Sequence, residues 1–523
     1  MNKIHVLDCT LRDGGYCNNW EFGFDNIRRI TDALVNSGVD VIECGFLSNK
    51  SDYDKNVSKF NALDDIAEII PKDKGGKLFV AMMNYGEYYV DVLPVCDGKS
   101  IDGIRVAFHK KNMSEALDLC KRIKAKGYLV FIQAMVSLAY SDEEFLDMIK
   151  RVNEVNPYSF YIVDSFGMMK GKDLTRLFYM VEHNLDEDIW IGFHSHNNMQ
   201  LAFSNAQTLC SVSTSRNLII DSSVYGMGRG AGNLNTELFV SYLNDNLGTD
   251  YNIKPLLNII DEILNDFYQR NYWGYSLPNY LSASHNAHPN YAGYLDDKKT
   301  LTVEDMNEIF SMMDDDKKVN FDKSYIEDLY LRYMEKGRVN NEHVAELKAA
   351  VEGKTLLLIA PGKSSTDEKG KINSFIENKE VASASVNFNF DGTDYIFLSN
   401  LRRFKELDDK SKNKCIVTSN VPAGKAYLST PYKELLNDEE AVKDNAGLMA
   451  IRFFINLGVN EIYLAGFDGY THDVKQNYGD SKLEFISKNA VLDAMNEGMN
   501  KTLSRYSKEV SIKFLTEPKN IRV

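Results

Sequence analysis

The strongest constraint on the fold of this chain is a regular alternation of short apolar runs with amphipathic helical patterns in its N-terminal half. The apolar runs are Ile4–Leu11, Asp40–Phe46, Lys77–Met83, Gly103–Phe108, Tyr128–Met135, Ser159–Phe166, Ile189–Phe193 and Asn217–Tyr225. Near-continuous apolar strands separated by helices indicate parallel strands buried on both faces. Eight such units in about 250 residues predict an α/β fold, namely a (β/α)8 TIM barrel. A doubly wound open sheet is the weaker alternative, because no Gly-x-Gly-x-x-Gly follows the first strand.

The rest of the 523-residue chain predicts two further parts. Residues 251–348 have helical patterns around an aromatic, turn-rich segment, and we expect a helical subdomain there. Near residue 350 the strand–turn–helix pattern restarts with Thr355–Ser364. We therefore expect a barrel over residues 1–250, a helical subdomain over 251–348 and a second, smaller Rossmann-like α/β domain over 349–523.

Polar side chains collect where the predicted barrel strands end. In a TIM barrel the active site lies at the C-terminal ends of the strands, so these side chains are the candidate site. The candidates for substrate binding are Arg12, Arg105, Gln133 and Ser165. The candidates for catalysis are Arg12, Tyr16, Glu43, His109 and Tyr291.

His194 and His196 form a His-x-His pair at the end of the seventh strand. Side chains at i and i+2 of a strand point to the same face, so the two imidazoles can share one divalent metal. Asp13, just past the first strand, is the best candidate for a third ligand. Two solvated or core-satisfied histidines are the alternative interpretation of such a pair. A carboxylate with two imidazoles suits Mn²⁺ or Mg²⁺, and Zn²⁺ is a further option.

Open positions on such a metal would admit a 2-oxo acid through its carboxylate and ketone oxygens. The metal would then stabilise the enolate that forms when a carbon–carbon bond breaks. Arg12 is permanently charged and could hold the developing oxyanion, while Glu43 could orient Arg12. Ser165 could donate a hydrogen bond to the carboxylate of the keto acid.

Several of these motifs together resemble a known superfamily. They are Leu11-Arg-Asp-Gly14, Ile42-Glu-Cys-Gly45, Ile104-Arg-Val-Ala-Phe-His109, Asp164-Ser165, His194-Ser-His-Asn197 and Gly228-Arg-Gly-Ala-Gly-Asn233. They are similar to motifs of the metal-dependent TIM-barrel lyases, which include HMG-CoA lyase, isopropylmalate synthase and the class II 4-hydroxy-2-oxovalerate aldolases. The fourth-strand motif most resembles the last of these.

The resemblance implies roles for particular residues. Asp13, His194 and His196 would bind the metal, and Asn233 could add a fourth ligand. Arg12 would be catalytic, and Ser165 would contact pyruvate. The resemblance also implies a homo-oligomer.

Tyr16 departs from the pattern of the hydroxyoxovalerate aldolases, in which a histidine at this position is the catalytic base. A phenol with a pKa near 10 is a poor base at neutral pH, although it can donate a proton or shape a pocket. A metal-bound water, His109 or Tyr291 could be the base instead.

The leading hypothesis is therefore a divalent-metal-dependent aldolase that makes or breaks a 4-hydroxy-2-oxo acid through a pyruvate enolate. A condensing enzyme for acyl-CoA and a 2-keto acid, of the isopropylmalate or citramalate synthase type, is the runner-up. A catalytically inactive binding barrel is the third option. The last domain resembles Rossmann-type domains of bacterial glycan-assembly and pterin-pyrophosphokinase-like proteins, through Ala360-Pro-Gly-Lys-Ser364 and Ile462-Tyr-Leu-Ala-Gly-Phe-Asp-Gly469. That resemblance implies a sugar-derived aldehyde.

The composition limits the classes of partner that we expect this chain to bind. The net charge is −15 and no long basic tract is present, which argues against nucleic acid or an anionic membrane as a partner. No apolar run reaches about 18 residues, so we expect no transmembrane helix. Seven cysteines without a Cys-x-x-Cys pair favour a reducing, cytoplasmic location. We expect a small-molecule substrate.

Overall fold

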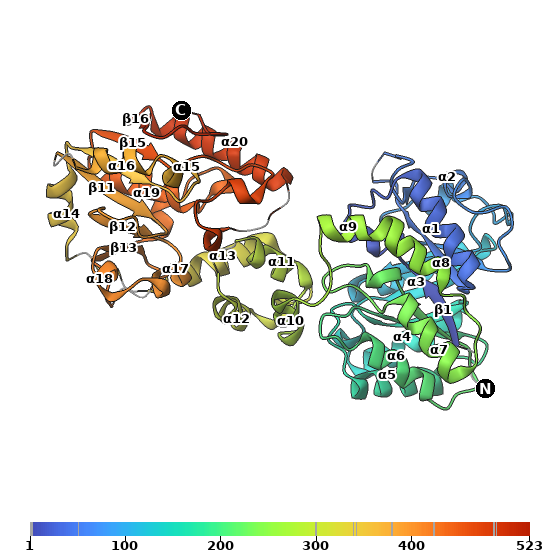
Figure 1. Ribbon diagram of the computed structural model, residues 1–523. Helices are drawn as coiled ribbons and strands as arrows, with labels where there is room; N and C mark the ends of the chain where they lie inside the picture. Colours follow the sequence, from blue (N-terminus) through green and yellow to red (C-terminus); the bar gives the residue numbers. More distant parts are fainter. Residues whose placement is uncertain are drawn as a thin grey trace. The chain divides into compact units, whose positions relative to one another are not determined.

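The computed structural model describes residues 4–50, 52–298, 301–337, 339–340, 342–377, 380–421, 424–484, 487 and 489–522. The chain divides into two compact units, shown as ribbons in Figure 1. The first unit comprises Met1–Gly293 and Asp314–Phe321, and the second comprises Tyr294–Met313 and Asp322–Val523. The three-part division expected at residues 250 and 348 stays a prediction.

The first unit contains a closed parallel barrel, which confirms the predicted TIM-barrel fold. Its strands are β1 (Ile4–Asp8), β2 (Val41–Leu47), β4 (Leu78–Asn84), β5 (Gly103–Phe108), β6 (Leu129–Ala134), β7 (Ser159–Asp164), β8 (Trp190–Ser195) and β9 (Leu218–Ser222). Each strand pairs with its neighbours in the order β1-β9-β8-β7-β6-β5-β4-β2, and β1 pairs with β2 to close the ring. A short strand, β3 (Lys59–Phe60), adds to β2 outside the ring.

Helices separate the barrel strands along the chain. They are α1 (Phe24–Ser37), α2 (Leu63–Ala67), α3 (Met113–Ala125), α4 (Asp142–Val155), α5 (Gly171–Asn184), α6 (Ala202–Ser211) and α7 (Thr236–Leu247). Local sequence fixes where some of them begin. The hydroxyl of Ser141 accepts a hydrogen bond from the backbone of Glu144 at 3.2 Å, and the Glu144 carboxylate accepts one from the backbone of Ser141 at 2.8 Å. This capping box satisfies two backbone donors that the first turn of α4 would otherwise leave unpaired.

The barrel interior is layered, and the layers decide where the site can lie. Its floor is apolar and includes Leu7, Val41, Phe131 and Ile219. Alternate residues of a barrel strand face the interior, so the next inward position is two residues further along. On β2 that position is Glu43, which is buried. The positions two residues beyond the other floor residues are buried as well. The upper layer, toward the carboxyl ends of the strands, is therefore polar.

The chain after the barrel is helical, as predicted. The helices in the first unit are α8 (Lys254–Ile259), α9 (Asn265–Arg270) and α10 (Leu277–Ser284), with a π-helical turn, η6 (Ile260–Leu264), between the first two. Helix α11 (Pro289–Asp297) begins in the first unit, and α12 (Val303–Ser311) and α13 (Lys323–Met334) belong to the second.

The second unit contains an open, fully parallel sheet in the order β14-β13-β12-β11-β10-β15-β16, which confirms the predicted second α/β domain. Its strands are β10 (Thr355–Ile359), β11 (Val381–Val386), β12 (Tyr395–Leu398), β13 (Cys415–Thr418), β14 (Leu428–Thr430), β15 (Glu461–Ala465) and β16 (Ser511–Phe514). Its remaining helices are α14 (Val344–Val351), α15 (Ser364–Asp367), α16 (Lys369–Ile376), α17 (Leu401–Glu406), α18 (Asp409–Lys412), α19 (Ala446–Asn456) and α20 (Asn489–Tyr506). Among the described residues, no helix is both long enough and apolar enough to cross a bilayer.

Candidate active site

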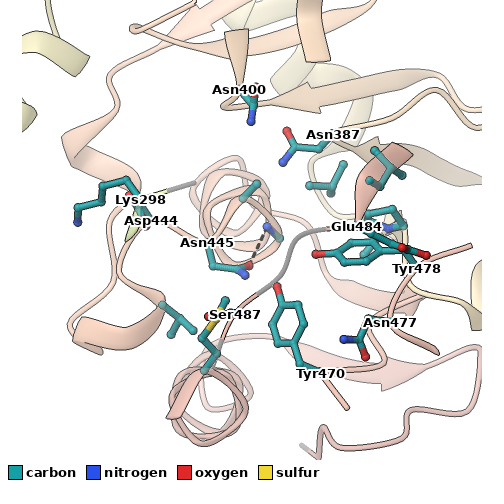
Figure 2. Close-up of a pocket in the computed structure, with 18 of the residues that line it drawn as sticks. Lys298, Asn387, Asn400, Asp444, Asn445, Tyr470, Asn477, Tyr478, Glu484 and Ser487 are labelled. Carbon is teal, nitrogen blue, oxygen red and sulfur yellow. Dashed lines mark hydrogen bonds between the residues drawn. The ribbon is translucent and has the colours of Figure 1, made fainter. Parts of the chain in front are cut away.

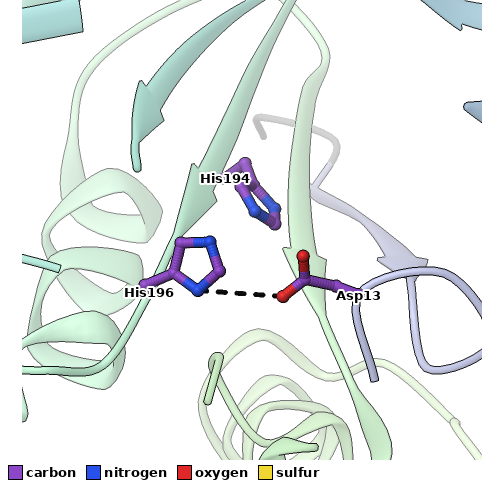
Figure 3. Close-up of side chains that lie close together, drawn as sticks. All are labelled: Asp13, His194 and His196. Atoms are coloured by element: carbon purple, nitrogen blue, oxygen red, sulfur yellow. Dashed lines mark ion pairs between the residues drawn. The ribbon is translucent and has the colours of Figure 1, made fainter. Parts of the chain in front are cut away.

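Asp13, His194 and His196 lie together at the carboxyl end of the barrel, as predicted (Figure 3). One ligand atom from each lies within 4.8 Å of the others, and all three residues are buried. Nδ1 of His196 is 3.7 Å from Oδ2 of Asp13. A tight turn positions Asp13, whose backbone N–H donates to the carbonyl of Cys9 at 2.8 Å. Strand β8 carries His194, and His196 follows its end.

The atoms around this group fit a divalent metal. Nδ1 of His196 and Oδ1 of Asn233 are buried and have no hydrogen-bond partner among the described residues. Leaving such atoms unpaired costs free energy, and a bound cation would remove that cost. Nδ2 of Asn233 donates to Oδ2 of Asp13 at 2.8 Å, so Asn233 lies beside the group. Carboxylate, imidazole and amide-oxygen ligands suit Mn²⁺, Mg²⁺ or Zn²⁺.

Gly228 leaves the space that these side chains occupy. A Cβ at this position would lie 2.4 Å from Nδ2 of Asn233 and 2.8 Å from Oδ2 of Asp13. Such distances are too short for real contacts, so a side chain here would push both groups away.

A buried chain of charges supports the metal group from below. Nδ1 of His194 contacts Oδ2 of Asp221 at 2.9 Å, which leaves Nε2 for a metal. Asp221 also forms an ion pair with Arg105. Arg105 in turn lies 2.8 Å from Oε2 of Glu43, and the same oxygen accepts a hydrogen bond from Nε of Arg12 at 2.9 Å. A carboxylate behind a metal-binding histidine fixes the orientation and tautomer of its ring.

This geometry assigns positions to three predicted residues. Glu43 holds Arg12, as expected from the sequence, and Arg12 also forms an ion pair with Asp13. Arg105 is fully buried and forms ion pairs with the carboxylates of Glu43 and Asp221, so in this structure it supports the site from beneath.

The surroundings of Asp13 and His196 shift the pKa values of these two residues toward their metal-binding forms. Burial by itself would raise the pKa of Asp13, but Arg12, His196 and His194 outweigh it and hold that pKa well below its usual range. Burial lowers the pKa of His196 to about 3, although Asp13 opposes this. A deprotonated carboxylate and a neutral imidazole are the forms that bind metals.

Arg229 organises the polar groups nearer to solvent. Its guanidinium donates to the carbonyl of Ser165 at 3.3 Å and lies 5.4 Å from the ring centre of Tyr16. It also lowers the pKa values of His109 and His288, after the larger effect of burial on each. The ring of His288 packs against Phe166 at 5.6 Å. Tyr16, His109 and Ser165 are thus brought near one cation.

The side chains of Ser165, Gln133 and Tyr291 differ in what they contact. The Ser165 hydroxyl accepts a hydrogen bond from the backbone of Val136 at 2.9 Å. Gln133 is buried on β6, and its Nε2 has no hydrogen-bond partner among the described residues. Tyr291 is fully buried, and its hydroxyl donates to the backbone carbonyls of Lys317 and Asn320 at 2.8 and 2.7 Å. The structure does not bring Tyr291 to the metal group.

Sequence reasoning missed Asp221, Arg229 and Asn198 as members of the candidate set, whereas it named His288 among the aromatic-patch residues that could reach the barrel mouth. Asn198 accepts from the backbone of Ala231 at 2.8 Å and donates to the carbonyl of Phe166 at 2.9 Å, so it joins the loops that follow β7, β8 and β9. A carboxylate inside the apolar run Leu218-Ile-Ile-Asp221 was a signal that the sequence offered. His288 packs against Phe166, which follows β7.

A closed parallel barrel with a buried carboxylate and two imidazoles at the carboxyl ends of its strands defines a TIM-barrel protein that can hold a metal ion. Residues 3–263 match the model of the HMGL-like family. This barrel-forming part of the chain belongs to the HMGL-like family.

Individual relatives are more distant. A 4-hydroxy-2-oxovalerate aldolase of Geobacillus thermodenitrificans is 26% identical over 267 residues, which cover 50% of this chain and 75% of that protein. An oxaloacetate decarboxylase of Mycobacterium tuberculosis is 27% identical over 244 residues, or 46% of this chain and 69% of that protein. Among solved structures, the N-terminal domain of a Bacteroides vulgatus protein is 28% identical with a TM-score of 0.49, covering 56% of this chain and 96% of that one.

Proposed function

We propose that the barrel is a divalent-metal-dependent carbon–carbon lyase that cleaves or forms a 4-hydroxy-2-oxo acid through a pyruvate enolate. The observation that carries the proposal is the buried group of Asp13, His194 and His196 beside Arg12. Relatives named 4-hydroxy-2-oxovalerate aldolase support this choice of substrate class. A bound divalent cation supplies Lewis-acid stabilisation of the negative charge that develops on the 2-oxo oxygen.

Arg12 contributes a second positive charge at the same place. Its guanidinium is fixed on two sides by Glu43 and Asp13, so it does not have to reorganise as charge develops on the substrate. Preorganised cations in a buried site stabilise a transition state more than mobile ones in water.

Cleavage also requires a group that removes the proton from the 4-hydroxyl. His109 fits this role better than Tyr16, because burial, Lys111 and Arg229 lower the pKa of its imidazole and keep it neutral at pH 7. The imidazole would take the hydroxyl proton, the C3–C4 bond would break, and its electron pair would pass into the enolate. Protonation at C3 would then release pyruvate beside the aldehyde.

Decarboxylation of oxaloacetate is a second candidate, favoured by a relative of that name. It leads to the same enolate, but carbon dioxide leaves without removal of a hydroxyl proton. A barrel with Tyr16 in place of a histidine base could therefore still perform it.

The test is an assay of pyruvate release, with added Mn²⁺ or Mg²⁺, from 4-hydroxy-2-oxo acids of increasing length and from oxaloacetate. Asp13→Ala should abolish release from both substrates. His109→Ala should lower kcat for the hydroxy acids by about 100-fold or more and spare oxaloacetate. His183→Ala is the matched control, because that histidine is exposed on α5.

Metal-dependent release from hydroxy acids would establish the aldolase, and release from oxaloacetate alone would establish the decarboxylase. Free CoA formed from acetyl-CoA and a 2-oxo acid, without pyruvate release, would instead favour the condensing reaction. Full activity of Asp13→Ala after metal removal would contradict the proposal.

A further inference from the structure

A cavity of about 980 Å³ lies within the second unit, at the carboxyl ends of its parallel strands (Figure 2). Its wall is formed by the segments that follow β10, β11, β12 and β15 and by the start of α19. Every residue that lines it belongs to the second unit, so it is separate from the metal group of the barrel.

The topology of the sheet places a ligand site here. Strand β10 lies between β11 and β15, and the chain extends from it through β11–β14 on one side and through β15–β16 on the other. In open α/β sheets, ligands bind outside the carboxyl ends of the strands at such a switch point. The turn after β10 is not the anion site, because the Asp468 carboxylate already accepts from the backbone N–H of Ser364 at 2.7 Å.

Two asparagines present donors to the cavity. Oδ1 of Asn387 accepts a hydrogen bond from the backbone of Ser399 at 3.4 Å, and Oδ1 of Asn400 accepts one from the backbone of Arg402 at 2.9 Å. Each side-chain oxygen is thus used inside the protein. Both residues line the cavity, and each has its amide NH₂ left to donate (Figure 2).

A tyrosine adds a rigidly held hydroxyl on the opposite wall. The backbone N–H of Tyr470 donates to Oδ1 of Asn496 at 2.7 Å, and its carbonyl accepts from Nδ2 of Asn496 at 2.7 Å. Side-chain hydrogen bonds join its hydroxyl to Tyr478 and Asn445. All three residues line the cavity (Figure 2). Burial raises the pKa of Tyr470, so the hydroxyl stays protonated and can donate.

Seven carboxylates and five cations line the cavity, and six of the seven carboxylates have a partner within the protein. Glu406 pairs with Arg403, Glu440 pairs with Lys323, and the Asp444 carboxylate accepts from the hydroxyls of Tyr330 and Tyr432. Two exposed cations that line the cavity, Arg402 and Lys482, have no ion pair with a carboxylate of the described residues.

One stretch of the wall is apolar. It consists of Val491, Met495 and Met499 of α20, Met306 of α12, and Leu301, which lies just before α12. A cavity that has both an apolar stretch of wall and a set of donors suits a ligand with a flat, weakly polar ring and an acceptor-rich anion.

We propose that this cavity binds a nucleoside phosphate, with its phosphate held by Asn387, Asn400 and the two cations and its base against the apolar wall. The same group occurs in free nucleotides and in nucleotide-linked sugars, and the test includes both. Cavities of this size bury ligands of that size.

The test is calorimetric titration of the full-length protein with the monophosphates of the four ribonucleosides, two nucleotide-linked hexoses and inorganic phosphate. At least one nucleotide should bind with a Kd at or below about 100 μM, and inorganic phosphate should bind more weakly. Tighter binding of a linked sugar than of its free nucleotide would identify the sugar conjugate as the ligand.

Asn387→Ala and Asn400→Ala should each weaken binding by about tenfold, since each removes a hydrogen bond to a charged group. Asn389→Ala is the matched control, because this asparagine follows the same strand, is exposed and does not line the cavity. Asp13→Ala should bind nucleotide normally, which separates this proposal from that for the barrel. Absence of nucleotide binding at millimolar concentrations, or equal binding by all variants, would overturn it.

Discussion

The carboxylate of Asp221 holds two side chains of the candidate site at once. It contacts His194 on one side and Arg105 on the other, and it is buried. Burial would raise the pKa of Asp221, but Arg105 and His194 lower it overall, so it remains ionised. The negative charge of Asp221 therefore orients the ring of His194 and also balances the positive charge of the buried Arg105 side chain.

Asp221→Asn should lower the affinity for Mn²⁺ by about 10- to 100-fold, because the His194 ring loses the anion that orients it. Titration calorimetry with the metal measures this directly. Asp188→Asn, at an exposed position, is the control. Unchanged metal affinity in the Asp221 variant would contradict this role of the Asp221 carboxylate.

Gly228→Ala tests the space beside the metal group without removing any ligand. Since the new Cβ would clash with Asn233 and Asp13, we expect metal affinity to fall by about tenfold or more while the circular dichroism spectrum is retained. Gly293→Ala should change nothing, because no atom lies within 4 Å of its added Cβ. Equal affinities for the two variants would contradict the placement of Gly228.

At the scale of elements, the strands were predictable and part of the site was not. The apolar runs predicted β5 at its observed bounds and the other barrel strands within a few residues. They could do so because a strand that is buried on both faces is an almost continuous run of apolar residues. The His-x-His pair and Asp13 were predictable from strand periodicity and position. The contact between Asp221 and His194 depends on the register of β8 and β9, which periodicity alone does not set.

Asp8 ties the end of β1 to the first residue of α7. Its carboxylate accepts from the backbone of Thr10 at 2.9 Å and from the hydroxyl of Thr236 at 2.6 Å. Burial raises the pKa of Asp8 to about 6, although these hydrogen bonds oppose it. Below about pH 6, the folded state therefore favours the protonated form of Asp8.

A raised carboxyl pKa contributes stability below the unfolded pKa, and that contribution is lost as the pH rises through the folded pKa. From pH 4 to pH 6, Asp8 should thus reduce the free energy of unfolding by on the order of 2–3 kcal/mol. Urea unfolding of the wild type and of Asp8→Asn at several pH values measures it. The stability of the variant relative to the wild type should rise over this interval, and a constant difference would refute the assignment.

At the scale of the whole molecule, the two units carry separate candidate ligand sites. A ligand stabilises only the unit whose folded form binds it, by about 2.7 kcal/mol at 100 times its Kd. Scanning calorimetry should therefore resolve two transitions. Mn²⁺ should raise the Tm of one and a chelator should lower it again, while the other transition stays in place. A single transition that shifts as a whole would contradict independent unfolding.

Residues 314–321 belong to the first unit although they follow part of the second unit in the sequence. This order affects how the protein can be expressed and how it folds during synthesis. Tyr291 packs against Phe321 with ring centres 5.0 Å apart, and its hydroxyl is held by the carbonyls of Lys317 and Asn320. A protein fragment that ends at Gly293 would therefore lack the residues that bury Tyr291 and accept its hydrogen bonds. On the ribosome, the first unit cannot be completed until residue 321 has emerged, when the first helix of the second unit has already been synthesised.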